Sequence, residues 1–305
     1  MIDYTAILDA INEDVQPYLA AGNVANYIPE LAAIPLEQFG MALVDDAGQV
    51  FTCGAARKPF SIQSISKVFT LTLALKEFGS DLWKRVGREP SGTAFNSLVH
   101  LEYEDGKPRN PFINAGALVV TDVVMGLYPQ PFDTIIETVR WLSGNRSIDV
   151  NPQVANSEET HGFRNASLAN FLKSFGRLDN PVDDVLATYY QQCALEMSAV
   201  DLALAGFFLM NQGLPLGSDQ AFINPSQAKY INSLMLTCGT YDSVGDFAYR
   251  VGLPGKSGVG GGILAVMPGK FSVCVWSPGL DPSGNSLAGS LALEWLTTKT
   301  GVSVF

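Results

Sequence analysis

The chain has 305 residues, 47% of them hydrophobic and 16% charged, a composition typical of a compact folded protein and not of a disordered one. Its 19 basic and 30 acidic residues give a net charge of −11, which argues against nucleic acid or an anionic membrane surface as a partner. Apolar runs stay well short of the roughly 20 residues that cross a bilayer. The N-terminus lacks the pattern of a secretory signal, and four scattered cysteines indicate a reduced, cytoplasmic protein.

Hydrophobic periodicity predicts strands near both ends of the chain and helices between them. The first elements are a helix over residues 4–19 and a hairpin whose strands, 39–44 and 49–53, flank a turn at 45–48. From residue 67 to about 237 the period is almost wholly helical, with helices predicted at 112–125, 132–142, 168–175, 182–193 and 199–211. Strands are predicted again at 247–251, 259–267 and 271–276, followed by a closing helix at 286–299.

This order predicts an α+β protein with one antiparallel sheet assembled from both chain ends. The first and last helices would cover one face of the sheet, and the long insert would form an all-α lobe. Because linkers and internal repeats are absent from the sequence, residues 1–305 are expected to form a single domain. Its sheet lobe would span about 1–66 and 238–305 and its helical lobe about 67–237, with a cleft where they meet.

A serine and a lysine three residues apart, Ser64 and Lys67, open the helical pattern that runs from residue 65 to 78. On a helix the two side chains share one face, so the lysine amine would lie beside the serine hydroxyl. Burial would lower the pKa of the lysine toward neutrality and let it accept the serine proton. The pair therefore predicts a nucleophile that needs no histidine. The tetrapeptide alone also fits a helix-capping serine with an exposed lysine, and Ser61 and Ser66 compete as caps.

Other catalytic and metal-binding patterns find little support in the sequence. The only histidines are His100 and His161, and no G-x-S-x-G sequence surrounds a serine, which argues against a Ser-His-Asp triad. The sequence contains no HExxH and no paired CxxC, and no phosphate-binding loop is complete. We therefore expect neither a metal ion nor an organic cofactor.

A glycine-rich segment near the C-terminus forms the second group of candidate residues. Four glycines follow Lys256 and Ser257 between residues 258 and 262, at the predicted start of the 259–267 strand. Glycine in a strand usually marks the close approach of a ligand or another backbone, and here it would leave N–H groups available to a substrate carbonyl. A glycine-rich bulge at the sheet edge is the alternative. Tyr241 lies in a turn-rich segment before these strands, whereas Tyr230 falls inside a predicted helix.

The order of these motifs resembles the serine β-lactamase and penicillin-binding fold, and more closely the serine-dependent glutaminase family within it. The resemblance runs nearly the length of the chain. It is carried by residues 26–31 (NYIPEL), 60–67 (FSIQSISK), 90–92 (PSG), 109–117 (RNPFINAGA), 164–165 (RN) and 252–262 (GLPGKSGVGGG). The chain departs from β-lactamases in having Ser257 where they have threonine and in lacking a Ser-Asp-Asn loop, which puts β-lactam chemistry in doubt.

The resemblance implies that Ser64 is the nucleophile and that Lys67 activates it. It also implies that the backbone N–H groups of Ser64 and Val259 form an oxyanion hole. Tyr241 matches the family's tyrosine beside the nucleophile, where it could pass a proton to the departing ammonia.

For substrate binding, the resemblance implies a further group of residues around the α-amino and α-carboxylate groups. Glu158 would pair with the ammonium, and asparagine and tyrosine side chains would donate to the carboxylate: Tyr27, Asn114, Asn165 and Tyr189. Each has a simpler alternative, since Asn114 could cap its helix, Tyr189 could be core, and Glu158 could be a solvated charge beside Glu159. Arg164 is a possible carboxylate clamp.

The function implied by this resemblance is hydrolysis of the side-chain amide of L-glutamine to L-glutamate and ammonia, through a seryl acyl-enzyme. The alternatives are a related serine amidase, peptidase or β-lactam-reactive acyl-transferase, and an inactive binding module. The joint presence of Ser64, Lys67 and Tyr241 speaks against the module. Bacterial relatives further imply a homo-oligomer, a dimer or a tetramer.

Overall fold

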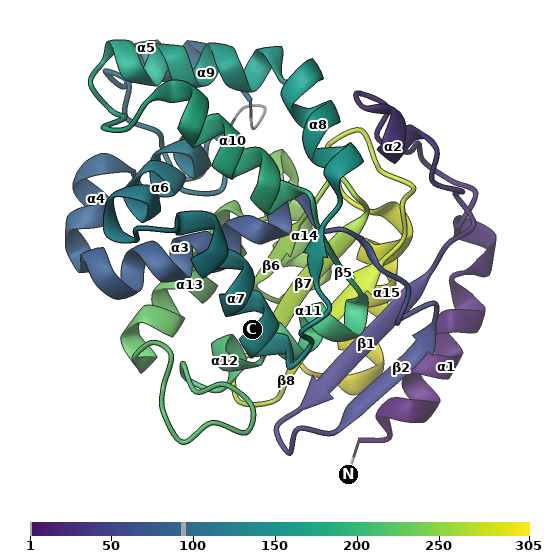
Figure 1. The fold of residues 1–305 in the computed structure, drawn as a ribbon. Helices are drawn as coiled ribbons and strands as arrows, with labels where there is room; N and C mark the ends of the chain where they lie inside the picture. The colour runs from purple at the N-terminus through teal and green to yellow at the C-terminus, as the bar shows by residue number, and fades with distance from the viewer. Residues whose placement is uncertain (1, 93–95) are drawn as a thin grey trace.

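The computed structural model describes residues 2–92 and 96–305. A five-stranded antiparallel sheet with strand order β2-β1-β8-β7-β6 runs through the molecule (Figure 1). Its strands are β1 (Gly40–Asp45), β2 (Val50–Gly54), β6 (Gly255–Ser257), β7 (Gly262–Met267) and β8 (Phe271–Trp276). Strand β1 pairs with β2 on one side and with β8 on the other. The α+β prediction, with a sheet built from both ends of the chain, is therefore confirmed.

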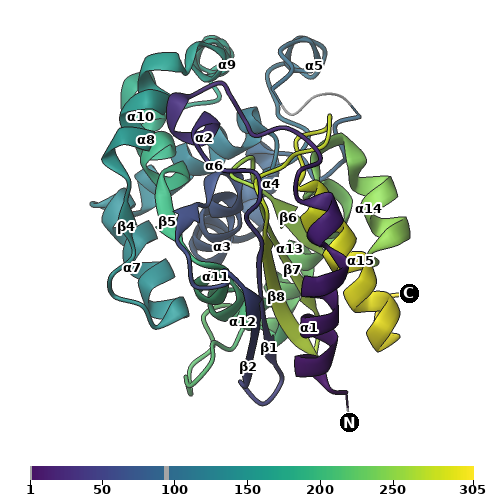
Figure 2. The same ribbon diagram turned by 90° about the vertical axis from the view of Figure 1, so that its right-hand side faces the viewer.

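The first and last helices cover one face of this sheet, as predicted. Helices α1 (Tyr4–Asp14) and α15 (Leu287–Thr300) lie side by side in Figure 2, on the same side of the strands. Leu8 and Ile11 of α1 pack with Leu293 of α15 and Val273 of β8 in one buried cluster. The predicted first helix is shorter than expected, because Pro17 follows in a separate 3₁₀ turn, Gln16–Tyr18, and a proline has no N–H to continue the helical ladder.

The helices between residues 29 and 238 lie mainly on the opposite side of the sheet and above it (Figures 1 and 2). They are α2 (Pro29–Ala32), α3 (Ser66–Phe78), α4 (Leu82–Arg85), α5 (Val99–Tyr103), α6 (Asn114–Leu127), α7 (Pro131–Ser143), α8 (Pro152–His161), α9 (Phe163–Ser174), α10 (Val182–Cys193), α11 (Ala199–Ala205), α12 (Phe207–Met210) and α13 (Pro225–Cys238). Short 3₁₀ turns lie at Gln63–Ile65, Gly79–Asp81 and Tyr241–Ser243. No helix within the described part of the chain combines the length and apolarity needed to span a membrane.

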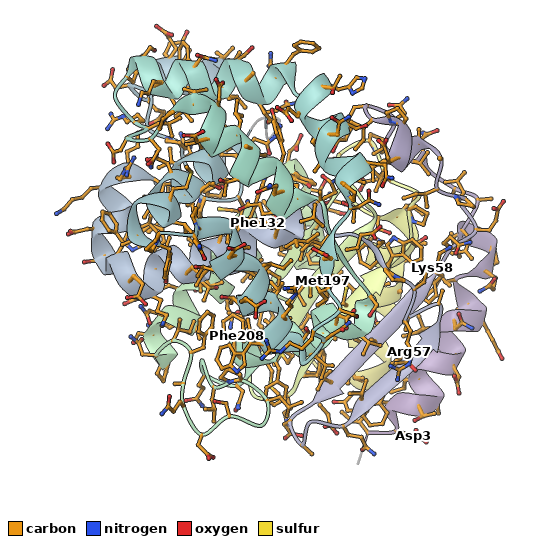
Figure 3. The ribbon with its side chains drawn as sticks, in the orientation of Figure 1. Asp3, Arg57, Lys58, Phe132, Met197 and Phe208 are labelled. Carbon is orange, nitrogen blue, oxygen red and sulfur yellow. The ribbon has the colours of Figure 1, made fainter. Side chains whose placement is uncertain are left out.

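The core on this side of the sheet joins the helices to the strands. Met197 and Phe208 belong to one large buried cluster, whereas Asp3 and Lys58 are exposed; all four are labelled in Figure 3. The ring of Phe60 stacks on Trp276 of β8 with 5.1 Å between ring centroids. This contact fixes the segment that leads to Ser64 against the end of the sheet.

A second, three-stranded sheet was not predicted. Strands β3 (Phe60–Ser61), β5 (Leu195–Met197) and β4 (Asp149–Val150) pair in the order β3-β5-β4. Two or three residues are too few to show a strand period, so the pattern of the sequence could not reveal them. The insert thus contains short strands as well as helices, and they tie the segment before Ser64 to the end of α10.

Three predicted elements are corrected by the structure. Residues 247–251 were predicted as a strand but lie mostly in helix α14 (Val244–Arg250), where Phe247 and Val251 are four residues apart and bury the same face. The predicted helix 199–211 is divided at Gly206, where a Cβ atom would lie 2.7 Å from Oγ of Ser272 in β8. The predicted strand 259–267 begins only at Gly262, since a turn precedes it.

Candidate active site

A cavity of about 270 Å³ opens beside Ser64, and the predicted site residues from seven segments of the chain gather around it. Its walls come from the loop before α2, the 3₁₀ turn before α3, the first turn of α6, helices α8, α9 and α10, and the turn between β6 and β7. Six of the predicted substrate-binding residues and Ser64 itself line the cavity: Tyr27, Asn114, Glu158, Asn165, Tyr189 and Val259. Lys67 and Tyr241 lie beneath this surface, 1% and 6% exposed.

Ser64 lies in the 3₁₀ turn that leads directly into α3, so it is near the positive end of the helix dipole. The residue before it, Gln63, has a φ of 49°, which sets the sharp turn between β3 and the helix. The two neighbouring serines are already engaged, since Ser61 Oγ donates to the carbonyl of Cys193 and Ser66 Oγ donates to the carbonyl of Gln63. Of the three serines, Ser64 is the one that faces the cavity.

Lys67 lies one turn further along and is completely surrounded by protein. Its Nζ donates to Oδ1 of Asn114 at 2.7 Å and to the carbonyl of Phe112 at 3.1 Å. Burial lowers the pKa of Lys67 to about 8, and the nearby Cys193 and Glu158 oppose this shift. Burial of the lysine agrees with the prediction, but within the described part of the chain its hydrogen-bond acceptors are these two oxygens and not the Ser64 hydroxyl.

Tyr241 contacts Ser64 from a segment far away in the sequence. It begins the 3₁₀ turn after α13 and has a φ of 57°, in the left-handed region. Burial raises the pKa of Tyr241 to about 12, against hydrogen bonds with Ser64 and Ser257 that lower it. Tyr230, by contrast, is 46% exposed on α13 and does not line the cavity.

A second buried lysine, Lys256, lies under Tyr241. Its Nζ is 4.5 Å from the centroid of the Tyr241 ring, and the side chain is fully buried. Burial, reinforced by the positive charge of Lys67, holds the pKa of Lys256 well below its usual range. The site therefore contains two lysines whose pKa is lowered by burial, which shifts each toward the neutral amine, the form that can accept a proton.

The glycine-rich segment forms a turn between β6 and β7, and not the interior of one strand. Its glycines are required because another backbone lies against them: a Cβ at Gly258 would be 2.6 Å from the Ile62 carbonyl oxygen, and one at Gly260 would be 2.3 Å from that of Ser61. The amides of Gly258 and Gly261 are used in hydrogen bonds within the turn. Among the described residues, the Val259 amide has no acceptor, and Val259 lines the cavity together with Ser64.

Tyr27, Glu158 and Asn165 line the part of the cavity that we call the far wall. Glu158 is buried there and only 4% exposed. Its Oε1 accepts a 2.6 Å hydrogen bond from the hydroxyl of Tyr27, which also contacts Oε1 of Gln63 at 3.2 Å. Burial raises the pKa of Glu158 above its usual range, while hydrogen bonds with Tyr27 and Gln63 and the charge of Lys67 oppose the shift. The neighbouring Glu159 is exposed, so the structure distinguishes the two glutamates that the sequence left open.

Asn114 lies between the lysine and the far wall. Its Nδ2 donates to Oδ1 of Asn165 at 2.9 Å, and its Oδ1 accepts from Lys67 and, at 3.4 Å, from the hydroxyl of Tyr189. The side chain is thus part of the site and not a helix cap. Arg164 also lines the cavity, but it is exposed and its Nε donates to the carbonyl of Asn96.

Sequence reasoning gave no role to two residues that the structure places at the centre of the site. Gln63 links Tyr27 to Ser61 through its side chain, and Lys256 lies under Tyr241. Both lie within the sequence motifs, since Gln63 precedes Ser64 and Lys256 precedes Ser257, but only the fold shows what they contact. In the described ranges, His, Cys, Asp and Glu side chains do not gather in threes to form a metal site.

The protein has the β-lactamase-like fold. Its sheet, the Ser64–Lys67 pair at the start of a buried helix and the facing turn between β6 and β7 define this class. The family model described as Glutaminase matches residues 22–305, and the chain belongs to the glutaminase family. It is 59% identical over 304 residues to a glutaminase of Ralstonia nicotianae, with all of both chains covered.

Solved structures agree with this relationship. A crystal structure of Mglu in its glutamate form is 34% identical with a TM-score of 0.93, and the match covers all of this chain and 70% of the other. A probable glutaminase from Bacillus subtilis, complexed with 6-diazo-5-oxo-L-norleucine, is 32% identical with a TM-score of 0.89, and the match covers 100% of this chain and 97% of that one.

Proposed function

We propose that this protein hydrolyses the side-chain amide of L-glutamine to L-glutamate and ammonia through an acyl-enzyme on Ser64. The observation that carries the proposal is that Ser64 faces the cavity while the lysine one turn away, Lys67, is buried with its pKa lowered to about 8. The identity of 59% to a glutaminase over the whole chain supports the choice of reaction.

In the first step, neutral Lys67 takes the proton of Ser64, and Oγ bonds to the carboxamide carbon. The carbonyl oxygen becomes an oxyanion, for which the N–H groups of Ser64 and Val259 provide donors beside the end of a helix. Collapse of this intermediate breaks the C–N bond, and the proton taken from Ser64 reaches the leaving nitrogen through Tyr241. Water then attacks the ester by the same route and releases glutamate.

The far wall would hold the α-groups of the substrate. Glu158 is the buried carboxylate that suits the α-ammonium, and its ionised form gains from the bond with Tyr27. The amides of Asn114 and Asn165 and the hydroxyl of Tyr189 provide donors for the α-carboxylate. Support comes from the similar proteins solved in a glutamate form and in complex with 6-diazo-5-oxo-L-norleucine, an amino acid of similar length to glutamine.

The remaining expectations also stand as proposals. The chain would act as a single domain in which the sheet lobe and the helical lobe share one cleft, without a metal ion or organic cofactor. It would function in the cytoplasm as a homo-oligomer, a dimer or a tetramer.

Ammonia release from glutamine by the purified protein tests the central proposal, with Ser64→Ala as its matched control. We expect release by the wild type, one ammonia per glutamate, and loss of most release in the variant. No ammonia from glutamine, together with acylation of Ser64 by a β-lactam, would instead identify a related serine acyl-transferase.

A further inference from the structure

Tyr241 adopts a backbone conformation that its own side chain disfavours. Its φ of 57° places a non-glycine residue in the left-handed region, at a cost of about 1–2 kcal/mol. Such a conformation persists only where the surrounding structure fixes it. The neighbouring Thr240 is 1% exposed, so the groups that hold this turn are buried protein groups.

One of these groups is the side chain of Asn285, which comes from a turn 45 residues away. Its Nδ2 donates to the carbonyl oxygen of Thr240 at 3.2 Å, and the residue is 2% exposed. Asn285 is itself fixed by Asp281. The backbone N–H of Asn285 donates to Oδ1 of Asp281 at 3.0 Å, and the backbone N–H of Asp281 donates to the backbone carbonyl of Asn285 at 2.8 Å. The side chain therefore presents its donor to Thr240 from a closed turn.

The same turn lies against the ring of Tyr241. A Cβ at Gly284, which has a φ of 89°, would be 3.8 Å from Cε2 of Tyr241 and 3.8 Å from Cγ1 of Val259. On its other side the turn is joined to the N-terminal segment, because Leu280 and Asn23 exchange backbone hydrogen bonds of 2.8 and 3.1 Å. Residues 280–286 are thus anchored to the segment that leads to Tyr27 and packed against the tyrosine beside the nucleophile.

We propose that Asn285 is a positioning residue, which holds Tyr241 against Ser64 through the carbonyl of Thr240. This inference rests on the catalytic role of Tyr241 in the proposed function. Without the Nδ2 donor, the turn at 240–243 can relax from the left-handed conformation and the phenol moves away from the nucleophile. The groups at the far wall keep their partners, so substrate binding is not affected directly.

Asn285→Asp tests this, because it keeps the shape of the side chain and removes the donor. We expect kcat for glutamine to fall by up to about 100-fold, since a displacement near 1 Å of a reacting group can cost that much, while KM changes little. Asn285→Ala introduces no charge beside Asp281 and gives the same measurement if the aspartate variant does not fold.

Asn232 of α13 offers a matched control. It is also buried, its Nδ2 also donates to one backbone carbonyl, that of Leu209 at 2.9 Å, and it lies outside the site. Neither asparagine has a partner for its Oδ1 among the described residues. Asn232→Asp should therefore lower the melting temperature about as much as Asn285→Asp does, but leave kcat unchanged.

A double-mutant cycle with Tyr241→Phe separates positioning from general stability. If Asn285 acts through Tyr241, adding Asn285→Asp to Tyr241→Phe should cause no further loss of kcat. Losses that multiply, or full kcat in a folded Asn285→Asp protein, would overturn the inference. Full activity of Tyr241→Phe alone would instead refute the role given to Tyr241 in the proposed function.

Discussion

Lys67 and Asn114 are joined by a 2.7 Å hydrogen bond from the lysine Nζ to the asparagine Oδ1. This bond connects the two halves of the site, because the Nδ2 of the same asparagine reaches Asn165 on the wall where the substrate α-groups would lie. An amide oxygen holds the lysine in place without an opposite charge, and burial can therefore lower the lysine pKa to about 8.

Replacing this amide by a carboxylate should change the pH dependence of the enzyme. In the wild type the base must be neutral, so kcat/KM should rise with pH and level off above about 8. Asn114→Asp places a negative charge on the lysine, which favours its protonated form and raises its pKa by roughly 1–3 units. The rising limb of the pH–rate profile should move to higher pH by a similar amount.

Asn165→Asp is the control for this prediction. It adds a carboxylate one hydrogen bond further from Lys67, so its limb should move less than that of Asn114→Asp. An unchanged profile in Asn114→Asp would show that another group, such as Lys256, is the base that titrates.

Ser64→Ala and Lys67→Ala should each abolish most turnover, and the double variant should be little worse than either. The two residues act as one unit, because the lysine serves only to activate the serine, and effects within such a unit do not add. Steady-state kinetics of the three variants checks this. Substantial activity in Ser64→Ala would move the nucleophile elsewhere, although Ser61 and Ser66 already donate to backbone carbonyls.

Gly116 and Gly126 lie on the same helix, α6, but differ in what surrounds them. A Cβ at Gly116 would be 1.8 Å from the Asn110 carbonyl oxygen, whereas one at Gly126 would meet nothing within 4 Å. Gly116→Ala should therefore destabilise the protein by at least about 1–3 kcal/mol through overpacking. Gly126→Ala should stabilise it by about 0.4–1 kcal/mol.

Urea unfolding of the two variants measures this difference. Gly116→Ala should also lower activity, because Phe112 and Asn114, the partners of Lys67, lie in sequence between the two clashing residues, Asn110 and Gly116. Equal stabilities of the two variants would show that the chain around Asn110 adapts and does not fix the start of α6.

The sequence was most informative where chemistry and periodicity are local. Short apolar runs beside turn residues indicated the sheet strands near both ends, and helical spacing with the neighbours Val68 and Phe69 indicated the burial of Lys67. The glycines after Ser257 were correctly linked to a close approach, but the partner is the backbone at residues 61 and 62 and the segment is a turn. A run of glycines indicates that side chains would not fit at those positions, but it does not show which atoms lie against them.

What the sequence could not show depends on contacts between distant segments. In the β3-β5-β4 sheet, β3 pairs with β5 across more than 130 positions through only two residue pairs, which leaves no periodic trace. Helix α14 was misread because Phe247 and Val251 suit a strand as well as a helix until the face they bury is known. Asn285 carries no motif, and its relation to Tyr241 appears only once residues 240 and 285 are side by side.

Glu158 provides the last prediction, which concerns selectivity for the substrate. If its buried carboxylate pairs with the α-ammonium, Glu158→Gln leaves that charge without a partner. Losing one member of a desolvated charge pair costs roughly 2–5 kcal/mol, so kcat/KM for glutamine should fall by about 30-fold or more. Glu159→Gln is the matched control, since the neighbouring carboxylate is exposed and its loss should change kcat/KM little.

Asparagine tests the same wall from the side of the substrate. It is one methylene shorter than glutamine, so its amide cannot reach Ser64 while its α-groups keep their partners at Glu158, Asn114 and Asn165. Wild-type protein should therefore turn over asparagine poorly. Glu158→Gln should narrow the difference in turnover between glutamine and asparagine, because the α-ammonium no longer fixes where the side-chain amide lies relative to Ser64. Equal turnover of the two amides by the wild type, or indifference to Glu158→Gln, would place the α-groups elsewhere in the cavity.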